Sequence, residues 1–125
     1  MSGIVIRTIK GEFTGELGDN TISDTIWLSL PQKFYINMLG SMIYFECPLD
    51  CPIEGEQVTR LRKGDIAYWP KAKALCFFFG PTPLSGSDGE PVSPYPVIVI
   101  GRLTGDYAGL EDAGDRQKIT IDRVQ

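Results

Sequence analysis

Short apolar runs with the two-residue period of a strand recur along this chain. β-branched residues dominate residues 4–9, and apolar and polar residues alternate over residues 11–17. Further apolar runs cover residues 34–39 and 42–47, joined by Gly40 and Ser41. A two-residue connection that begins with glycine favours a tight hairpin. These runs predict a strand pair followed by a hairpin.

Four more runs of this kind complete a set of eight predicted strands: residues 65–69, 74–79, 97–103 and 118–124. Residues 48–56 are predicted to be a loop. Residues 81–96 contain five prolines and are predicted to form a second, long loop. Loops of that length are uncommon in compact domains and are usually functional or mobile.

One amphipathic helix is predicted over residues 21–30. Asn20 or Thr21 can cap its first turn, Ile22 and Ile26 fall on one face, and Pro31 ends the run. Residues 106–112 are predicted to form a second, short helix. Eight short strands and no break in composition over 125 residues predict one mostly β domain (1–125). A closed eight-stranded β-barrel with one or two short capping helices fits this count.

Charge and hydropathy exclude two classes of partner. The net charge is −4, and the few clustered cations, such as Arg60, Arg62 and Lys63, do not form the basic stripe that a nucleic-acid-binding protein needs. The apolar runs are too short to span a bilayer. The first residues lack a signal-peptide pattern, so a cytoplasmic protein is expected.

The sequence contains no histidine, which removes the common nucleophile systems and all imidazole metal sites. Cys47 is the last residue of the predicted strand 42–47, Cys51 lies four residues further on in the predicted loop, and Cys76 lies in a predicted strand. An odd number of cysteines argues against a disulfide framework, and further zinc ligands are lacking. We therefore expect loop cysteines, with no catalytic residue, metal or cofactor; a metal or redox role of the pair is the alternative.

The segment GDIAYWPKAKALCFFFGPTPL, residues 64–84, closely resembles small stand-alone cyclophilin-like proteins of prokaryotes, whose biochemical role is unassigned. It resembles the cyclophilin peptidyl-prolyl isomerases more distantly, and the order of predicted elements agrees over nearly the whole chain. The resemblance implies a cyclophilin-like barrel. Whether the fold forms an oligomer is not determined by the sequence.

Comparison with the isomerases bears on catalysis. The position that resembles their central arginine is Ile36, and their pocket phenylalanine and two glutamines correspond to Ser41, Tyr44 and Cys76. Residues with the apolar character of that pocket remain at Met42, Phe78 and Leu84. The resemblance therefore implies that the chain is not an efficient isomerase, although a weak or divergent activity is the alternative.

Side chains alternate along a strand, so Phe78 should point away from Phe77 and Phe79 and face outward beside Trp69 and Tyr44. An outward aromatic cluster next to a long loop indicates a binding surface. The alternative is that the predicted helix covers Phe78. The predicted ligand-binding residues are Met42, Tyr44, Trp69, Phe78 and Leu84. The expected ligand is a small apolar molecule or a proline-containing peptide, and a scaffold without a pocket is the third possibility.

Overall fold

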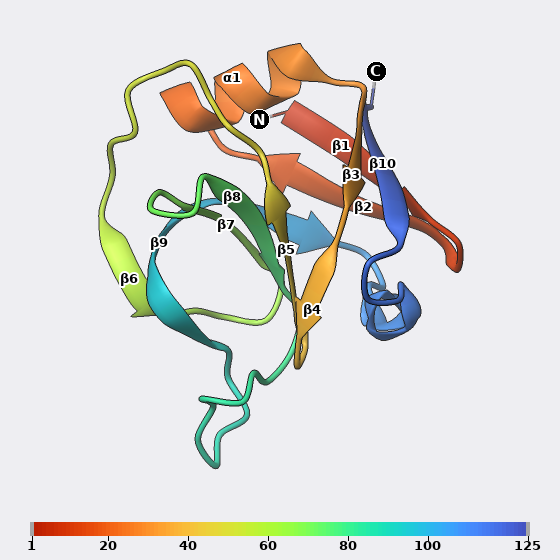
Figure 1. Ribbon diagram of the computed structural model, residues 1–125, viewed down its shortest axis with the longest axis vertical. Coiled ribbons are helices and arrows are strands. Elements are labelled where there is room, and N and C mark those ends of the chain that lie inside the picture. The colour runs from red at the N-terminus through yellow and green to blue at the C-terminus, as the bar shows by residue number, and fades with distance from the viewer. Residues whose placement is uncertain (1, 125) are drawn as a thin grey trace.

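The computed structural model describes residues 2–124 and consists mostly of antiparallel strands (Figure 1). The helices are α1 (Thr21–Ser29) and the short 3₁₀ helix η1 (Ala108–Asp112). The strands are β1 (Ser2–Thr8), β2 (Gly11–Leu17), β3 (Gln32–Tyr35), β4 (Asn37–Leu39), β5 (Met42–Glu46), β6 (Gln57–Arg60), β7 (Asp65–Trp69), β8 (Ala74–Phe78), β9 (Val92–Thr104) and β10 (Lys118–Arg123).

All ten strands belong to one curled sheet with the order β3-β10-β1-β2-β9-β7-β8-β5-β4, and β6 pairs with β9 beside this path. Within residues 2–124 the order has two ends, because β3 and β4 do not pair with each other. The mostly β class is confirmed. The expectation of a closed barrel of eight strands was wrong in both closure and number.

The sheet has two ends because the predicted strand 34–39 is interrupted at Ile36. The Ile36 N–H donates to the carbonyl of Gln117 at 3.0 Å, and the Ile36 carbonyl accepts from Arg116 N–H at 2.7 Å. These bonds tie Ile36 to the turn before β10, so β3 pairs with β10 while β4 pairs with β5. One predicted strand therefore becomes two, and β6, in a segment for which no element was predicted, is the tenth.

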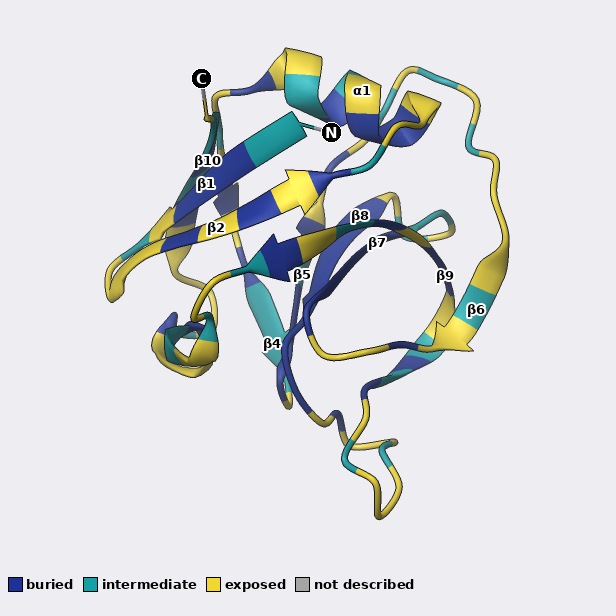
Figure 2. Ribbon diagram, turned by 180° about the vertical axis from the view of Figure 1, so that it is seen from behind, coloured by how far each residue is buried: buried dark blue, intermediate teal, exposed yellow. Residues whose placement is uncertain are grey.

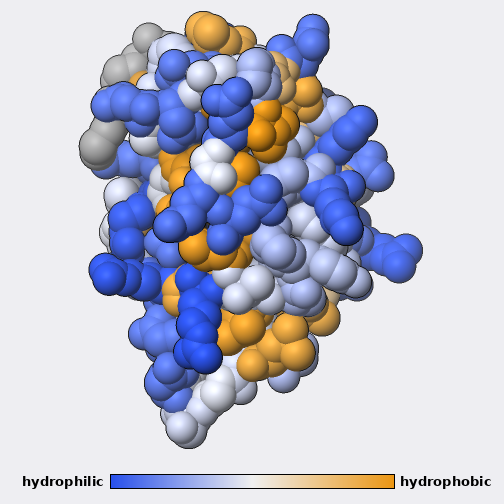
Figure 3. Space-filling model, turned by 90° about the vertical axis from the view of Figure 1, so that its left-hand side faces the viewer, coloured by the Kyte–Doolittle hydropathy of each residue, from blue (hydrophilic) through white to orange (hydrophobic). Residues whose placement is uncertain are grey.

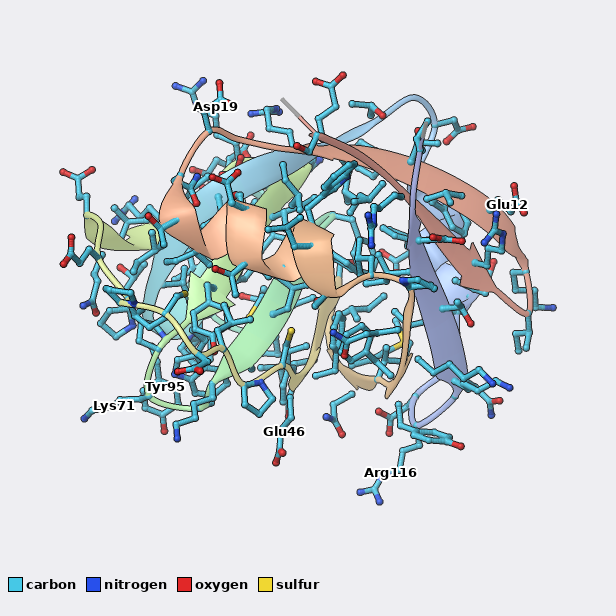
Figure 4. The ribbon with its side chains drawn as sticks, turned by 90° about the horizontal axis from the view of Figure 1, so that it is seen from above. Glu12, Asp19, Glu46, Lys71, Tyr95 and Arg116 are labelled. Carbon is cyan, nitrogen blue, oxygen red and sulfur yellow. The ribbon has the colours of Figure 1, made fainter. Side chains whose placement is uncertain are left out.

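Helix α1 forms where the sequence predicts it. The Asn20 side chain caps the first turn by accepting a hydrogen bond from the Ser23 N–H at 2.8 Å. Ile22 and Ile26 are buried, and the helix packs on β1, β2 and β9. Viewed from above, it lies across one opening of the curled sheet (Figure 4). The hairpin of β4 and β5 is also confirmed, with Gly40 at a φ of +59° in its turn.

The structure contains two apolar cores on opposite faces of β5, β7 and β8. The first core lies inside the curl of the sheet and includes Ile43, Phe45 and Phe77. The second core lies on the outer face and is smaller. Its buried members are Met42, Leu61, Ala67, Cys76, Phe78 and Val97, and the half-buried residues Leu39, Tyr44, Val58 and Trp69 pack against it.

Candidate functional site

The five predicted binding residues lie on one side of the sheet but do not form one exposed surface. Met42 and Phe78 are completely buried. Tyr44 and Trp69 are half-buried at the border of the second core, and Leu84 is 55% exposed in the loop after β8. Whether any of the five binds a ligand stays a prediction.

The expectation that Phe78 faces solvent was wrong. Its ring does point away from Phe77, as the alternation of side chains requires, but Leu61 and Val97 pack over it in the second core. The alternative cover, helix α1, packs on the first core instead. Figure 2 shows the result: β7 and β8 are buried along nearly their whole length, whereas β6 is largely exposed.

An aromatic row borders the second core. The Tyr44 ring meets Trp69 edge-on, with centroids 5.9 Å apart, and the Tyr95 ring stacks on Trp69 at 5.0 Å with an interplanar angle of 16°. Tyr95 was predicted to lie in a loop and was not expected in this cluster. Its neighbours on both sides are prolines, which favour a loop prediction.

A large bulge in β9 brings Tyr95 onto Trp69. Val97 pairs with Val58 of β6 and Val92 pairs with Arg60, so the four residues 93–96 of β9 face the single residue Thr59. Pro94 and Pro96 have no backbone N–H, so they leave no unpaired donor in the bulge. The bulge projects the Tyr95 ring out of the ladder.

The indole N–H of Trp69 is buried and has no hydrogen-bond partner within residues 2–124. A buried donor without a partner costs about 1–3 kcal/mol. The other tryptophan behaves normally, because the Trp27 indole donates to the Gly3 carbonyl at 3.1 Å. This unsatisfied donor, which lies beneath the surface, distinguishes Trp69 from Trp27.

An open groove of about 620 Å³ lies between the end of β6 and the loop of residues 81–91. We call it the groove. It is lined by Thr59, Arg60, Leu61, Leu84, Gly86, Ser87, Asp88, Glu90, Pro91 and Val92. Leu61 is shared with the second core, so an apolar floor lies at the bottom of a surface that opens to solvent. Of the predicted binding residues, only Leu84 lines this groove.

The loop that forms one wall of the groove is held by its own hydrogen bonds. The Thr82 N–H donates to Ser85 Oγ at 2.9 Å, and the hydroxyl of Thr82 donates to the Val92 carbonyl at 2.6 Å. Ser85 Oγ in turn donates to the Glu90 carbonyl at 2.7 Å. At the base, the Ser41 N–H donates to the Pro81 carbonyl at 2.8 Å. These hydrogen bonds hold this wall of the groove in place.

The groove carries charges of both signs. The guanidinium of Arg60 makes no ion pair or hydrogen bond within the described chain. The carboxylates accept only backbone hydrogen bonds: Asp88 from the Glu90 N–H at 3.0 Å, and Glu90 from the Lys63 N–H at 3.4 Å. All three charged side chains are exposed and free to meet a charged ligand.

The cysteines are free thiols in two different environments. Cys47 lies in the first core, where its carbonyl accepts a hydrogen bond from the Tyr68 hydroxyl at 2.9 Å, and Cys76 lies in the second core. Burial raises the pKa of Cys47 to about 11 and that of Cys76 to about 12. Both are therefore protonated at neutral pH and are poor nucleophiles. Cys51 is half-buried in the loop after β5.

The positions that resemble the isomerase pocket are dispersed. Ile36 is fully buried in the first core, so it faces away from Met42 and Phe78. The hydroxyl of Ser41 donates to the Glu111 carboxylate, and Cys76 is enclosed in the second core. Ile36, Ser41 and Cys76 therefore present no donor to an open apolar pocket.

Among residues 2–124, no group of three cysteine or acidic side chains is placed to hold a metal ion. None of the helices in that range is long and apolar enough to cross a membrane. The cytoplasmic location stays a prediction.

Comparisons with known proteins agree with the resemblance in the sequence. The model of a family described as cyclophilin-like matches residues 2–122. The solution structure of the hypothetical protein AF2241 from Archaeoglobus fulgidus superposes with a TM-score of 0.79 at 32% identity, covering 98% of this chain and 95% of that one. No curated protein matches the chain. That archaeal protein is described as hypothetical, so the comparisons carry no activity over.

Proposed function

The chain belongs to the cyclophilin-like family, and we propose that it is a non-catalytic binding domain whose groove holds an extended peptide segment. The observation that carries the proposal is the groove itself, a preformed cavity of about 620 Å³ whose wall is fixed by hydrogen bonds. A preformed site avoids the entropy cost of ordering a loop when the ligand binds. A small apolar molecule in the same groove is the second candidate.

The lining favours an apolar side chain on the ligand. The buried residues Leu61 and Pro91 line its inner part, while Leu84 is exposed in the loop. Leu84 is 55% exposed, so a ligand that covers it removes apolar surface from water. Full burial of a leucine side chain is worth about 1.5–3 kcal/mol. This exposed leucine is the natural contact for an apolar group.

The charges of the groove favour a ligand with a backbone carbonyl and a basic side chain. The free guanidinium of Arg60 can donate to a peptide carbonyl, whereas Asp88 and Glu90 attract a cation. A peptide with a lysine between two leucines satisfies both sets of groups. An apolar molecule without charge would use only the leucines.

The burial of Ile36 supports a non-catalytic role. An isomerase needs a donor beside the proline ring to lower a rotation barrier of about 18–20 kcal/mol. Ile36 offers no donor and faces the first core. Assays with a proline-containing peptide should therefore show no acceleration of isomerisation. A rate near that of a cyclophilin would contradict the non-catalytic role, and its loss in Arg60→Ala would identify the donor.

Binding can be measured by fluorescence anisotropy with a labelled peptide, Gly-Leu-Lys-Leu-Gly. We expect saturable binding to the wild type and about tenfold weaker binding to Leu84→Ser, because roughly 1.4 kcal/mol of apolar contact is lost. Leu28→Ser is the matched control, since Leu28 is 69% exposed on α1, away from the groove, and its replacement should leave binding unchanged. Replacing the peptide lysine by glutamate should weaken binding.

Equal losses in Leu84→Ser and Leu28→Ser would mean that the groove is not the site. Binding that is indifferent to the charge of the peptide but still lost in Leu84→Ser would favour a small apolar molecule as the natural ligand. In that case a thermal-shift screen identifies it, since a ligand of the folded state raises the melting temperature.

A further inference from the structure

A second, smaller cavity lies at the other end of the β6–β9 pair. It has a volume of about 130 Å³ and is lined by Gln57, Trp69, Lys71, Tyr95 and Pro96; we call it the Trp69 pocket. The pocket shares no lining residue with the groove. Figure 3 shows this side of the molecule, where apolar side chains form an interrupted strip among charged ones.

The walls of the Trp69 pocket are flat and apolar. The stacked rings of Trp69 and Tyr95, 5.0 Å apart, and the ring of Pro96 supply them. Rings stacked this closely leave no room for a cation between them, and Lys71 repels one at the rim. The walls therefore suit a small aromatic or branched apolar group, and the volume limits it to about one ring.

The unpaired polar groups of the pocket offer hydrogen-bond donors. The ammonium of Lys71 and the side-chain amide of Gln57 have no partner within residues 2–124, and the indole N–H of Trp69 is buried without one. No carboxylate lines the pocket, in contrast to the groove. Lys71 and Tyr95 lie together at one edge of the molecule in Figure 4, and the nearby Glu46 points away from them.

We propose that the Trp69 pocket binds a carboxylate attached to an aromatic or branched apolar group. The carboxylate pairs with the Lys71 ammonium and accepts from the Gln57 amide, while the apolar group packs on Trp69, Tyr95 and Pro96. The pocket supplies two exposed donor groups and no competing acid, a combination that favours an anion with several acceptor oxygens. Both a free carboxylic acid and the C-terminus of a peptide present this chemistry.

The indole N–H resonance of Trp69 in ¹⁵N-labelled protein reports directly on the pocket. The chain has two tryptophans, and Trp69→Phe identifies which indole signal belongs to residue 69. Titration with N-acetyl-phenylalanine up to about 10 mM, a range that detects millimolar binding, should shift the Trp69 signal. The signal of Trp27, whose indole is paired with the Gly3 carbonyl, should stay in place. N-acetyl-phenylalanine amide, which lacks the carboxylate, should shift neither.

Lys71→Gln should weaken the binding of N-acetyl-phenylalanine about tenfold, the effect of roughly 1.4 kcal/mol. Lys73→Gln is the matched control, since Lys73 belongs to the same turn but does not line the pocket. Binding of acetyl-Gly-Gly-Phe at least about tenfold tighter than that of the free acid would identify a peptide C-terminus as the source. Equal affinity supports a free acid. Absence of a shift, equal binding of the amide, or unchanged binding in Lys71→Gln would overturn the proposal.

Discussion

Truncation of Phe78 measures how completely the second core closes over the outer face of β8. The side chain is fully buried among Met42, Leu61 and Val97, so Phe78→Ala removes a ring whose space the fold must fill or leave empty. Truncation of a buried phenylalanine costs about 3–5 kcal/mol, the sum of lost transfer free energy and the cavity that remains. Domains of this size are stable by about 5–15 kcal/mol in total.

We expect Phe78→Ala near the lower end of that range, at about 3 kcal/mol. The half-buried side chains of Tyr44 and Trp69 border the second core and can move into part of the space. Phe77→Ala should lie near the upper end, because Phe77 is enclosed in the first core with the Phe45 ring 5.6 Å away.

The assay is urea denaturation, with Tyr35→Ala as the control. Tyr35 is 71% exposed, and replacement of such a residue changes stability by about 0.5 kcal/mol or less. A cost below about 1 kcal/mol for Phe78→Ala would show that the ring is not tightly packed, since removal of a packed ring costs more than that. It would restore the view that Phe78 faces an open site.

Three further predictions concern the thiols and the packing of β9. Burial raises the pKa of Cys76 to about 12 from an ordinary value of 9.0. As the pH rises, the thiol therefore ionises in the unfolded chain at a lower pH than in the folded protein. The free energy of unfolding, followed by urea denaturation at several pH values, should therefore fall from about pH 9 towards pH 12, and Cys76→Ala should flatten the fall. At pH 8 a thiol reagent followed by absorbance should modify one thiol, Cys51, rapidly, while buried Cys47 and Cys76 react only as the protein unfolds. Gly101→Ala should cost more than about 2 kcal/mol in urea denaturation, because its Cβ would lie 2.3 Å from the Glu16 carbonyl oxygen; retained stability would mean that β2 and β9 approach less closely.

Local sequence patterns were sufficient to predict the features that depend only on residues close together in the sequence. The Asn20 cap, the turn at Gly40 and the opposite faces of Phe77 and Phe78 all follow from a few adjacent residues, and the structure confirms them. The periods of helix and strand decide such features before any tertiary contact forms.

What covers each face depends on distant segments and could not be predicted in the same way. Phe78 was expected to face solvent because strand β6 was not predicted. Without β6, nothing indicated that Leu61, which follows this strand, packs on the outer face of the sheet. The signal for β6 was weak: Val58 and Thr59 are its only adjacent β-branched residues. Tyr95 was missed because its flanking prolines favour a loop, although a bulge also accommodates them.

On the proposed function, ligand binds in the groove and not at the buried residues beneath it. Titration of ¹⁵N-labelled protein with unlabelled Gly-Leu-Lys-Leu-Gly, followed by amide chemical shifts, distinguishes the two locations. We predict that the shifted amides cluster at residues 59–61 and 84–92, which line the groove or lie in its wall. Shifts confined to other parts of the chain, or none at saturating peptide, would contradict the assignment of the groove as the binding site.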